Sequence, residues 1–119
     1  MANVISVEVE KFPIAGSFTI SRGSKTEAEV VTCTIRDGNN AGRGECVPYR
    51  RYGETVEGVC AAIEEISARI AAGLDRQALL DAMPAGAARN AVDCALWDLE
   101  AKASGRTVAS LVARQAGPL

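Results

Sequence analysis

The sequence predicts an α+β fold, in which a three-stranded antiparallel meander is followed by a small helical bundle. Three observations support this prediction. Apolar and polar residues alternate in the early part of the chain, as they do in half-buried strands. From residue 55 onward, apolar residues recur at the spacing of one helix face instead. The segments also follow one another over mostly short connections, strands first and helices afterwards.

The expected strands cover approximately residues 3–12, 27–36 and 41–47. In the first strand, Val7 and its apolar neighbours alternate with serine and glutamate. Pro13 ends this strand or places it at a sheet edge, because proline cannot donate to a ladder. The run Asp37-Gly38-Asn39-Asn40 is typical of a hairpin turn, since Gly and Asn tolerate positive φ.

The third expected strand carries Gly42 and Gly44 on the same face. Alternate glycines weaken a strand, so their presence indicates that another backbone or a helix approaches this face closely. The helix expected over 87–104 has an apolar face rich in alanine, so a neighbouring element can pack very close to it.

The expected helices cover approximately residues 56–72, 76–83, 87–104 and 108–113. Thr55, Asp75 and Thr107 stand where N-cap residues are preferred, and Gly105 stands where a glycine commonly ends a helix. Lys102 places a positive charge in the last turn of the third helix, where the helix dipole favours it. The residues expected to face the core are Val59, Ile63, Ile66, Ile70, Ala78, Leu79, Met83, Ala88, Ala91, Val92, Ala95, Leu96, Leu99, Ala103, Val108, Leu111 and Val112.

Length and composition limit the class of protein. A chain of 119 residues is the size of one domain, expected here over 1–119, and its 48% hydrophobic content excludes wholesale disorder. A formal charge of −2 without any basic run argues against nucleic acid or a membrane as a partner. The sequence has no membrane-span-length apolar run and no signal-peptide pattern at its start, so a cytoplasmic protein is expected. The cysteines, in a chain without histidine, are expected to be reduced core residues rather than zinc ligands: Cys33, Cys46, Cys60 and Cys94.

The third helix carries polar residues that could be mistaken for a site. Asp93 and Asp98 lie roughly 140° apart around the helix at 100° per residue, so they cannot chelate one metal together. Pairing with Arg89 or Lys102, or capping of nearby backbone, is the favoured role. Trp97 is expected to be a packing residue with its N–H bonded.

Two polar segments, residues 14–26 and 48–54, are expected to be loops. Arg22 lies in the first, and Arg50, Arg51 and Tyr52 lie in the second. A guanidinium group on a loop is suited to a bidentate grip on a carboxylate or phosphate, but an ordinary solvated loop has the same composition. Spacing alone leaves both interpretations open. With no histidine and no nucleophile–base pair, the chain is not expected to catalyse a reaction unaided.

The chain resembles the N-terminal capping domain of the enolase superfamily. Within it, the chain is most similar to the mandelate racemase/muconate lactonizing enzyme branch and to dipeptide epimerases of the L-Ala-D/L-Glu type. Three segments carry the resemblance, which covers essentially all residues: FTISRGSKTEAEVV, GRGECVPYRRYGET and ARNAVDCALWDLEAKASG.

The resemblance implies an enolase-like cap that works with a TIM barrel absent from this chain. In that family the barrel supplies two lysines and three acidic Mg²⁺ ligands, and an α-carbon is inverted through an enediolate, which divalent charge stabilises. We therefore expect the chain to be a fragment of a racemase or epimerase, inactive and without a metal of its own. Mg²⁺ is expected in the full-length enzyme, with its ligands in the barrel.

The resemblance also assigns roles in the two loops. Arg22 would hold a carboxylate of a dipeptide substrate, and Phe18 and Ile20 would line the entrance to the same substrate site. Tyr52 would lie in a loop that sets substrate specificity. The barrel is the other expected partner, and the isolated chain is expected to self-associate through the surface that the barrel covers. Two alternatives remain: the cap of a muconate cycloisomerase or o-succinylbenzoate synthase, and a stand-alone binding or oligomerisation module.

Overall fold

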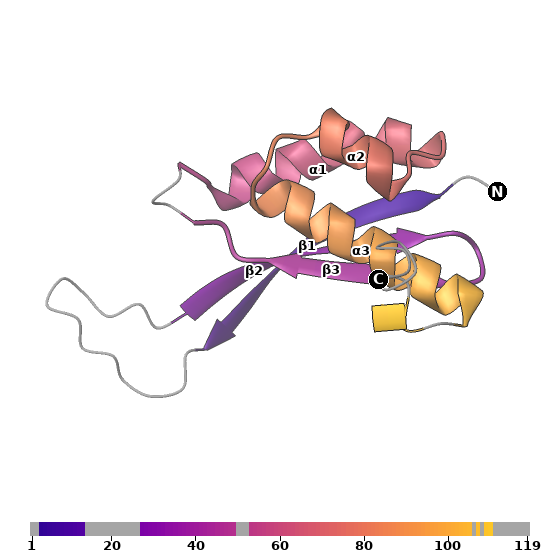
Figure 1. The fold of residues 1–119 in the computed structure, drawn as a ribbon. Helices are drawn as coiled ribbons and strands as arrows, with labels where there is room; N and C mark the ends of the chain where they lie inside the picture. Colours follow the sequence, from indigo (N-terminus) through magenta and orange to yellow (C-terminus); the bar gives the residue numbers. More distant parts are fainter. Residues whose placement is uncertain (1–2, 14–26, 50–52, 106, 108, 111–119) are drawn as a thin grey trace, which may run out of the picture.

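The computed structural model describes residues 3–13, 27–49, 53–105, 107 and 109–110. Three strands form an antiparallel sheet in the order β1-β2-β3, and helices cover one of its faces (Figure 1). This arrangement confirms the predicted α+β class and the predicted meander. The elements are β1 (Val4–Pro13), β2 (Glu27–Arg36), β3 (Ala41–Cys46), α1 (Val56–Ala71), α2 (Arg76–Ala82) and α3 (Ala87–Ser104).

The core lies between the sheet and the helices. α1 packs on β1 and β2, α3 packs on β2 and β3, and α2 packs against α3. From the central strand, Val31, Cys33 and Ile35 are fully buried beneath the helices. The opposite face of the sheet is polar, and Arg43 pairs there with Glu10 at 3.0 Å and with Glu45 at 3.2 Å.

β3 and α3 meet at backbone distance. A Cβ on Gly42 would overlap the Ala95 carbonyl oxygen, and a Cβ on Gly44 would overlap the Ala91 carbonyl oxygen. The alternate glycines therefore allow the helix to approach closely, as the sequence predicted. Because α3 presents small residues here, little besides backbone separates the two elements.

Two side chains of α3 also bind the backbone of β3. The Arg43 N–H donates to Asp98 Oδ2 at 2.9 Å, and Lys102 Nζ donates to the Ala41 carbonyl at 2.9 Å. Asp98 and Lys102 pair with each other at 3.0 Å, so the structural role expected for Asp98 is confirmed. Partial burial alone would raise the pKa of Asp98, but the hydrogen bonds from Arg43 and Lys102 and the Lys102 charge hold it below its usual value.

The helix ends follow the expected capping. Thr55 Oγ1 accepts from the Gly58 N–H at 3.0 Å, and Asp75 Oδ1 accepts from the Ala78 N–H at 2.8 Å. Gly105 ends α3 in the left-handed conformation at φ 69°. Residues 109 and 110 are helical, and the rest of the helix expected over 108–113 lies outside the described residues.

Some expected core residues are not buried. Ala78 is exposed, because only Leu79 of α2 is fully directed into the core. Ala103 is exposed along an open groove that Leu99 also lines, and Ala101 is buried instead. The exposed Cys94 is likewise not a core residue.

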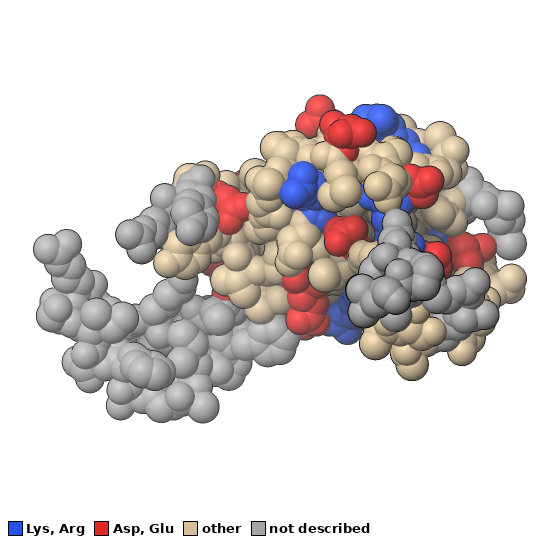
Figure 2. All heavy atoms as spheres, viewed as in Figure 1, with Lys and Arg blue, Asp and Glu red and all other residues tan. Residues whose placement is uncertain are grey.

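The distribution of charge on the surface and the length of the helices are relevant to binding of nucleic acid or a membrane. On the face shown in Figure 2, acidic and basic side chains of the described residues are interspersed rather than gathered by sign. Within the part of the chain that the structure describes, no helix is both long and apolar enough to cross a bilayer.

Candidate functional site

Both polar segments join the sheet at the same end. Pro13 of β1 pairs with Glu27 of β2, so residues 14–26 connect these strands there. β3 ends at Cys46, opposite Val31 of β2, and therefore finishes at this end too. Figure 1 shows that α1 begins here as well. We call this region, from Pro13 and Glu27 across to Cys46 and the start of α1, the loop end.

The four residues expected to bind substrate are Arg22, Phe18, Ile20 and Tyr52, and all four lie outside the described residues. Their roles therefore remain predictions. What the structure describes is the framework that holds both segments at their ends.

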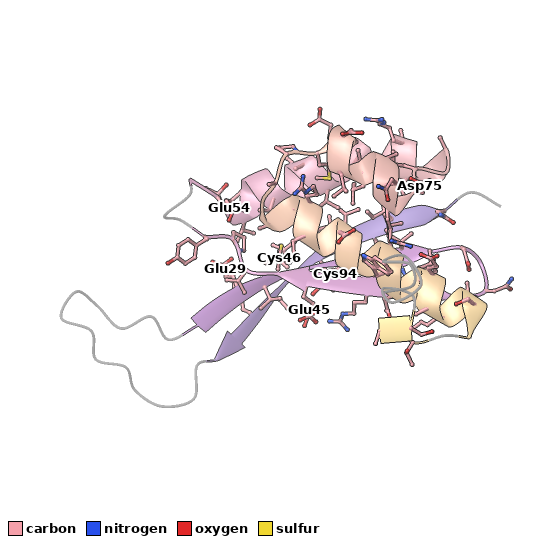
Figure 3. The ribbon with its side chains drawn as sticks, in the orientation of Figure 1. Glu29, Glu45, Cys46, Glu54, Asp75 and Cys94 are labelled. Atoms are coloured by element: carbon pink, nitrogen blue, oxygen red, sulfur yellow. The ribbon has the colours of Figure 1, made fainter. Side chains whose placement is uncertain are left out.

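Glu54 connects three parts of the loop end. Its Oε1 accepts from the Tyr49 N–H at 2.9 Å, and its Oε2 accepts from the Ala87 N–H at 2.7 Å. The Glu54 N–H donates in turn to the Tyr49 carbonyl at 3.2 Å. These bonds join Tyr49, Glu54 and the first residue of α3. Figure 3 shows Glu54 beside the start of α1.

The start of α3 explains why a carboxylate is favourable there. Gly86 is the N-cap residue and has no side chain that could accept from the first N–H groups. Glu54 supplies that acceptor and places negative charge at the positive end of the helix dipole. The hydrogen bonds from Ala87 and Tyr49 lower the pKa of Glu54, so it is ionised at neutral pH. A Cβ on Gly86 would lie 3.0 Å from Glu54 Oε2, so the glycine leaves room for this contact.

The neighbours of Glu54 have their own backbone roles. Gly53 has φ +76°, a conformation that strains any residue with a Cβ. Thr55 caps α1 in the next position. Gly53, Glu54 and Thr55 thus serve in succession as a turn residue, a link to α3 and a helix cap.

Apolar side chains are exposed around the loop end. Val47 is 58% exposed and Tyr49 is 49% exposed, just beyond β3. Val9 is 43% exposed although it lies on the helix-covered face of the sheet, opposite Val31. These residues form an incompletely covered surface beside the two segments.

The described residues do not form a magnesium site. Among them, no three His, Cys, Asp or Glu side chains lie together in a group that could hold a metal ion. The cysteines are also poor nucleophiles: burial raises the pKa of Cys33 to about 12 and the pKa of Cys46 to about 11.

Sequence reasoning did not single out Glu54. Its partner Ala87 is 33 residues away, and no local pattern links the two positions. One signal was available: the third helix begins after Gly86 without a Ser, Thr, Asp or Asn cap, so its first N–H groups are open to an acceptor from another part of the chain.

Comparison with known proteins identifies the family. Residues 1–113 match the model described as "Mandelate racemase / muconate lactonizing enzyme, N-terminal domain". The chain belongs to this family. Over 108 residues it is 44% identical to the L-Ala-D/L-Glu epimerase of Escherichia coli K12, and the match covers 91% of this chain and 34% of the epimerase.

Solved structures in the mandelate racemase/muconate lactonizing enzyme family show the same fold. One is an enolase family member from Agrobacterium tumefaciens with homology to dipeptide epimerases, solved with bound sodium and L-Ala-L-Glu. It is 63% identical to this chain with a TM-score of 0.87, and the match covers 92% of this chain and 34% of the A. tumefaciens chain. A dipeptide epimerase from Methylococcus capsulatus, complexed with Mg and L-Arg-D-Lys, is 32% identical to this chain with a TM-score of 0.70. That match covers 88% of this chain and 33% of the M. capsulatus chain. The chain therefore spans about a third of the length of these relatives.

Proposed function

We propose that this chain is the cap of a dipeptide epimerase and that its loop end faces the substrate. The observation that carries the proposal is that the strand ends flanking residues 14–26, and the end of β3 that precedes residues 48–54, lie at the same end of the sheet. The similarity to the E. coli epimerase, and to an A. tumefaciens protein with bound L-Ala-L-Glu, supports a dipeptide as the substrate class. The rest of the protein would then be a barrel that carries the catalytic groups.

In this proposal Arg22 binds a carboxylate of the dipeptide by a bidentate contact. Phe18 and Ile20 line the mouth of the site, and Tyr52 contributes to specificity. The cap itself binds, orients and excludes water from the substrate.

Magnesium is proposed for the full-length enzyme, because the M. capsulatus relative contains it. The described residues do not offer a metal site, so its ligands would lie outside them. A cytoplasmic location is proposed together with this activity.

The test uses the full-length protein that contains this chain. It is incubated with L-Ala-D-Glu, L-Ala-L-Glu and related dipeptides in D₂O with Mg²⁺, and NMR follows exchange of the α-proton. We expect exchange and interconversion of the two epimers. An absence of exchange with every dipeptide, or turnover of a cycloisomerase or o-succinylbenzoate synthase substrate instead, contradicts the proposal.

The role of Arg22 is tested by Arg22→Ala, with Lys25→Ala in the same segment as the control. Loss of a charged hydrogen bond to substrate corresponds to roughly tenfold or more in kcat/KM, and we expect most of it in KM. An equal effect of both substitutions would contradict a specific role for Arg22.

We also propose that the isolated chain self-associates through the loop end. Val9, Val47 and Tyr49 are 43%, 58% and 49% exposed there, and a barrel would cover such a surface in the whole protein. Gel filtration at micromolar concentration should show a dimer or larger species. A monomer that binds no hydrophobic dye would contradict this.

A further inference from the structure

We infer that Asp98 and Lys102 keep the outer edge of β3 closed to any further β-strand, because they occupy the backbone groups with which such a strand would pair. The inference concerns association of the protein with other copies of itself, and it does not depend on the proposed function. Neither the family match nor the relatives assign a role to this edge.

The outer edge of β3 is the side of the strand that faces away from β2. Among the described helices and strands, β3 contacts only β2 and α3, so no strand lies along this edge. The N–H and C=O of a strand residue point to the same side, and that side alternates from one residue to the next. Because the Arg43 N–H donates to Asp98 rather than to β2, Ala41, Arg43 and Glu45 direct their backbone groups to the outer edge.

Two side chains of α3 stand in for a neighbouring strand at this edge. Asp98 Oδ2 accepts from the Arg43 N–H at 2.9 Å, and Lys102 Nζ donates to the Ala41 carbonyl at 2.9 Å. In a parallel ladder, one residue of an added strand makes the same two bonds, because its N–H donates to one C=O and its C=O accepts from the N–H two residues further on. The carboxylate and the ammonium group thus replace one residue of a fourth strand.

The position of α3 explains why its side chains reach the edge. Gly42 and Gly44 allow the helix to approach β3 at backbone distance. Asp98 and Lys102 lie one helical turn apart and pair with each other at 3.0 Å, so each charge has a partner of opposite sign as well as a backbone partner. Their side chains are 31% and 52% exposed, so the edge that they close lies at the surface, within reach of another chain.

The partner that the closed edge excludes is a second copy of the protein. An open strand edge presents unpaired N–H and C=O groups, which are a template for a strand of another copy. Proline, lysine and bulges protect many edges, but β3 contains no proline and no lysine, and its register with β2 has no bulge. Protection of this edge therefore depends on α3.

Variants of the full-length protein test the inference, because the isolated chain is itself expected to associate through the loop end. Asp98→Ala/Lys102→Met removes both bonds, while methionine keeps most of the length of the lysine side chain. Asp98→Asn/Lys102→Arg is the conservative counterpart, since an amide oxygen still accepts from the Arg43 N–H and a guanidinium still donates to the Ala41 carbonyl. Lys102→Met alone opens only that carbonyl, and it takes the place of the double variant if the latter does not fold.

Glu100→Ala is the matched control. It breaks another ion pair of α3, the 2.6 Å contact with Arg76 of α2, and leaves the edge of β3 unchanged. Sedimentation velocity at micromolar concentrations measures association of variants that circular dichroism shows to be folded. We expect Asp98→Ala/Lys102→Met to associate at least about tenfold more tightly than the wild type, and the control and the conservative variant to match the wild type.

Hydrogen exchange at the Arg43 N–H gives a readout that general destabilisation would not produce. In the wild type this N–H is held by Asp98, so its exchange should be slow at every protein concentration. In Asp98→Ala/Lys102→Met it should be fast in dilute solution. It should become slow again where the protein associates, because a strand of the second copy then accepts from it.

The outcomes are distinct. Tighter association together with concentration-dependent protection of the Arg43 N–H supports the inference. A folded variant that does not associate, or one that associates while this N–H stays unprotected, overturns it. Equal association of Glu100→Ala or of Asp98→Asn/Lys102→Arg also overturns it, because the edge remains closed in both.

Discussion

Gly44→Ala tests the close packing of β3 and α3. The new Cβ would overlap the Ala91 carbonyl oxygen and would lie 2.8 Å from the Ala95 nitrogen. These are backbone atoms of a helix, so no side chain can rotate away to make room. The helix as a whole has to move off the strand.

The cost follows from this geometry. Overpacking a filled core costs about 1–3 kcal/mol, and sometimes more. Replacing glycine by alanine returns about 0.4–1 kcal/mol, because the unfolded chain loses conformational freedom. The displaced helix also stretches the bond from the Arg43 N–H to Asp98, which is 2.9 Å long. We therefore expect a net loss of about 2 kcal/mol or more in the free energy of unfolding.

The assay is urea unfolding of the 119-residue chain, followed by the fluorescence of Trp97, which is the single tryptophan and lies on α3. The control is Gly58→Ala in α1, whose Cβ would meet the Thr55 hydroxyl rather than backbone. Alanine is favoured over glycine in a helix by about 1 kcal/mol, so this variant should lose little stability. If Gly44→Ala unfolds within about 0.5 kcal/mol of the wild type, the packing argument is wrong.

Two further predictions concern ionisable groups. Asp98→Ala should cost about 1–2 kcal/mol at pH 7, because it removes the acceptor for the Arg43 N–H. The native pKa of Asp98 lies below its usual 3.8, so the stability difference between wild type and Asp98→Ala is fully present above pH 3.8 and shrinks as the pH falls through the native pKa. Urea unfolding at pH 7 and at pH 3 measures this stability difference. A difference that is the same at both pH values would contradict the prediction. Ellman's reagent at pH 8 should modify the exposed Cys94 first, while Cys33, whose pKa burial raises to about 12, should react only with unfolding. Peptide mapping identifies the labelled thiols, and early labelling of Cys33 would refute its burial.

The contact between β3 and α3 could be predicted in large part because its signals are local. Gly42 and Gly44 indicate a close approach by their spacing alone, and the alanine-rich face of residues 87–104 indicates an element able to make it. The structural role of Asp98 was predicted for a similar reason, since Lys102 stands one helical turn away. The hydrogen bond that the Arg43 N–H donates to Asp98 depends on tertiary packing, and helical spacing contains no information about it.

The framework of the loop end could not be predicted in the same way. Glu54 accepts a hydrogen bond from Ala87, which is 33 residues away in the sequence. This contact exists only because the tertiary fold brings the starts of α1 and α3 together. The spacing of apolar residues also did not predict which residues are buried in the last turn of a helix. Ala101 and Ala103 exchange their expected environments, because the last turn of α3 borders an open groove rather than the core. The roles of Arg22 and Tyr52 came from family resemblance, and they remain predictions.

The glycine face of β3 has a consequence for synthesis of the chain. β2 and β3 form a local hairpin, but the partner that covers β3 arrives much later, since Lys102 follows Ala41 by 61 residues. At about 5–20 residues per second, a ribosome needs roughly 3–12 s to make that stretch. During this interval the face of the nascent hairpin that α3 later covers is exposed and can associate with another chain. Translation pauses within residues 47–104 would prolong this exposure, and holdase chaperones that bind extended chains would have their greatest effect on yield in the same interval.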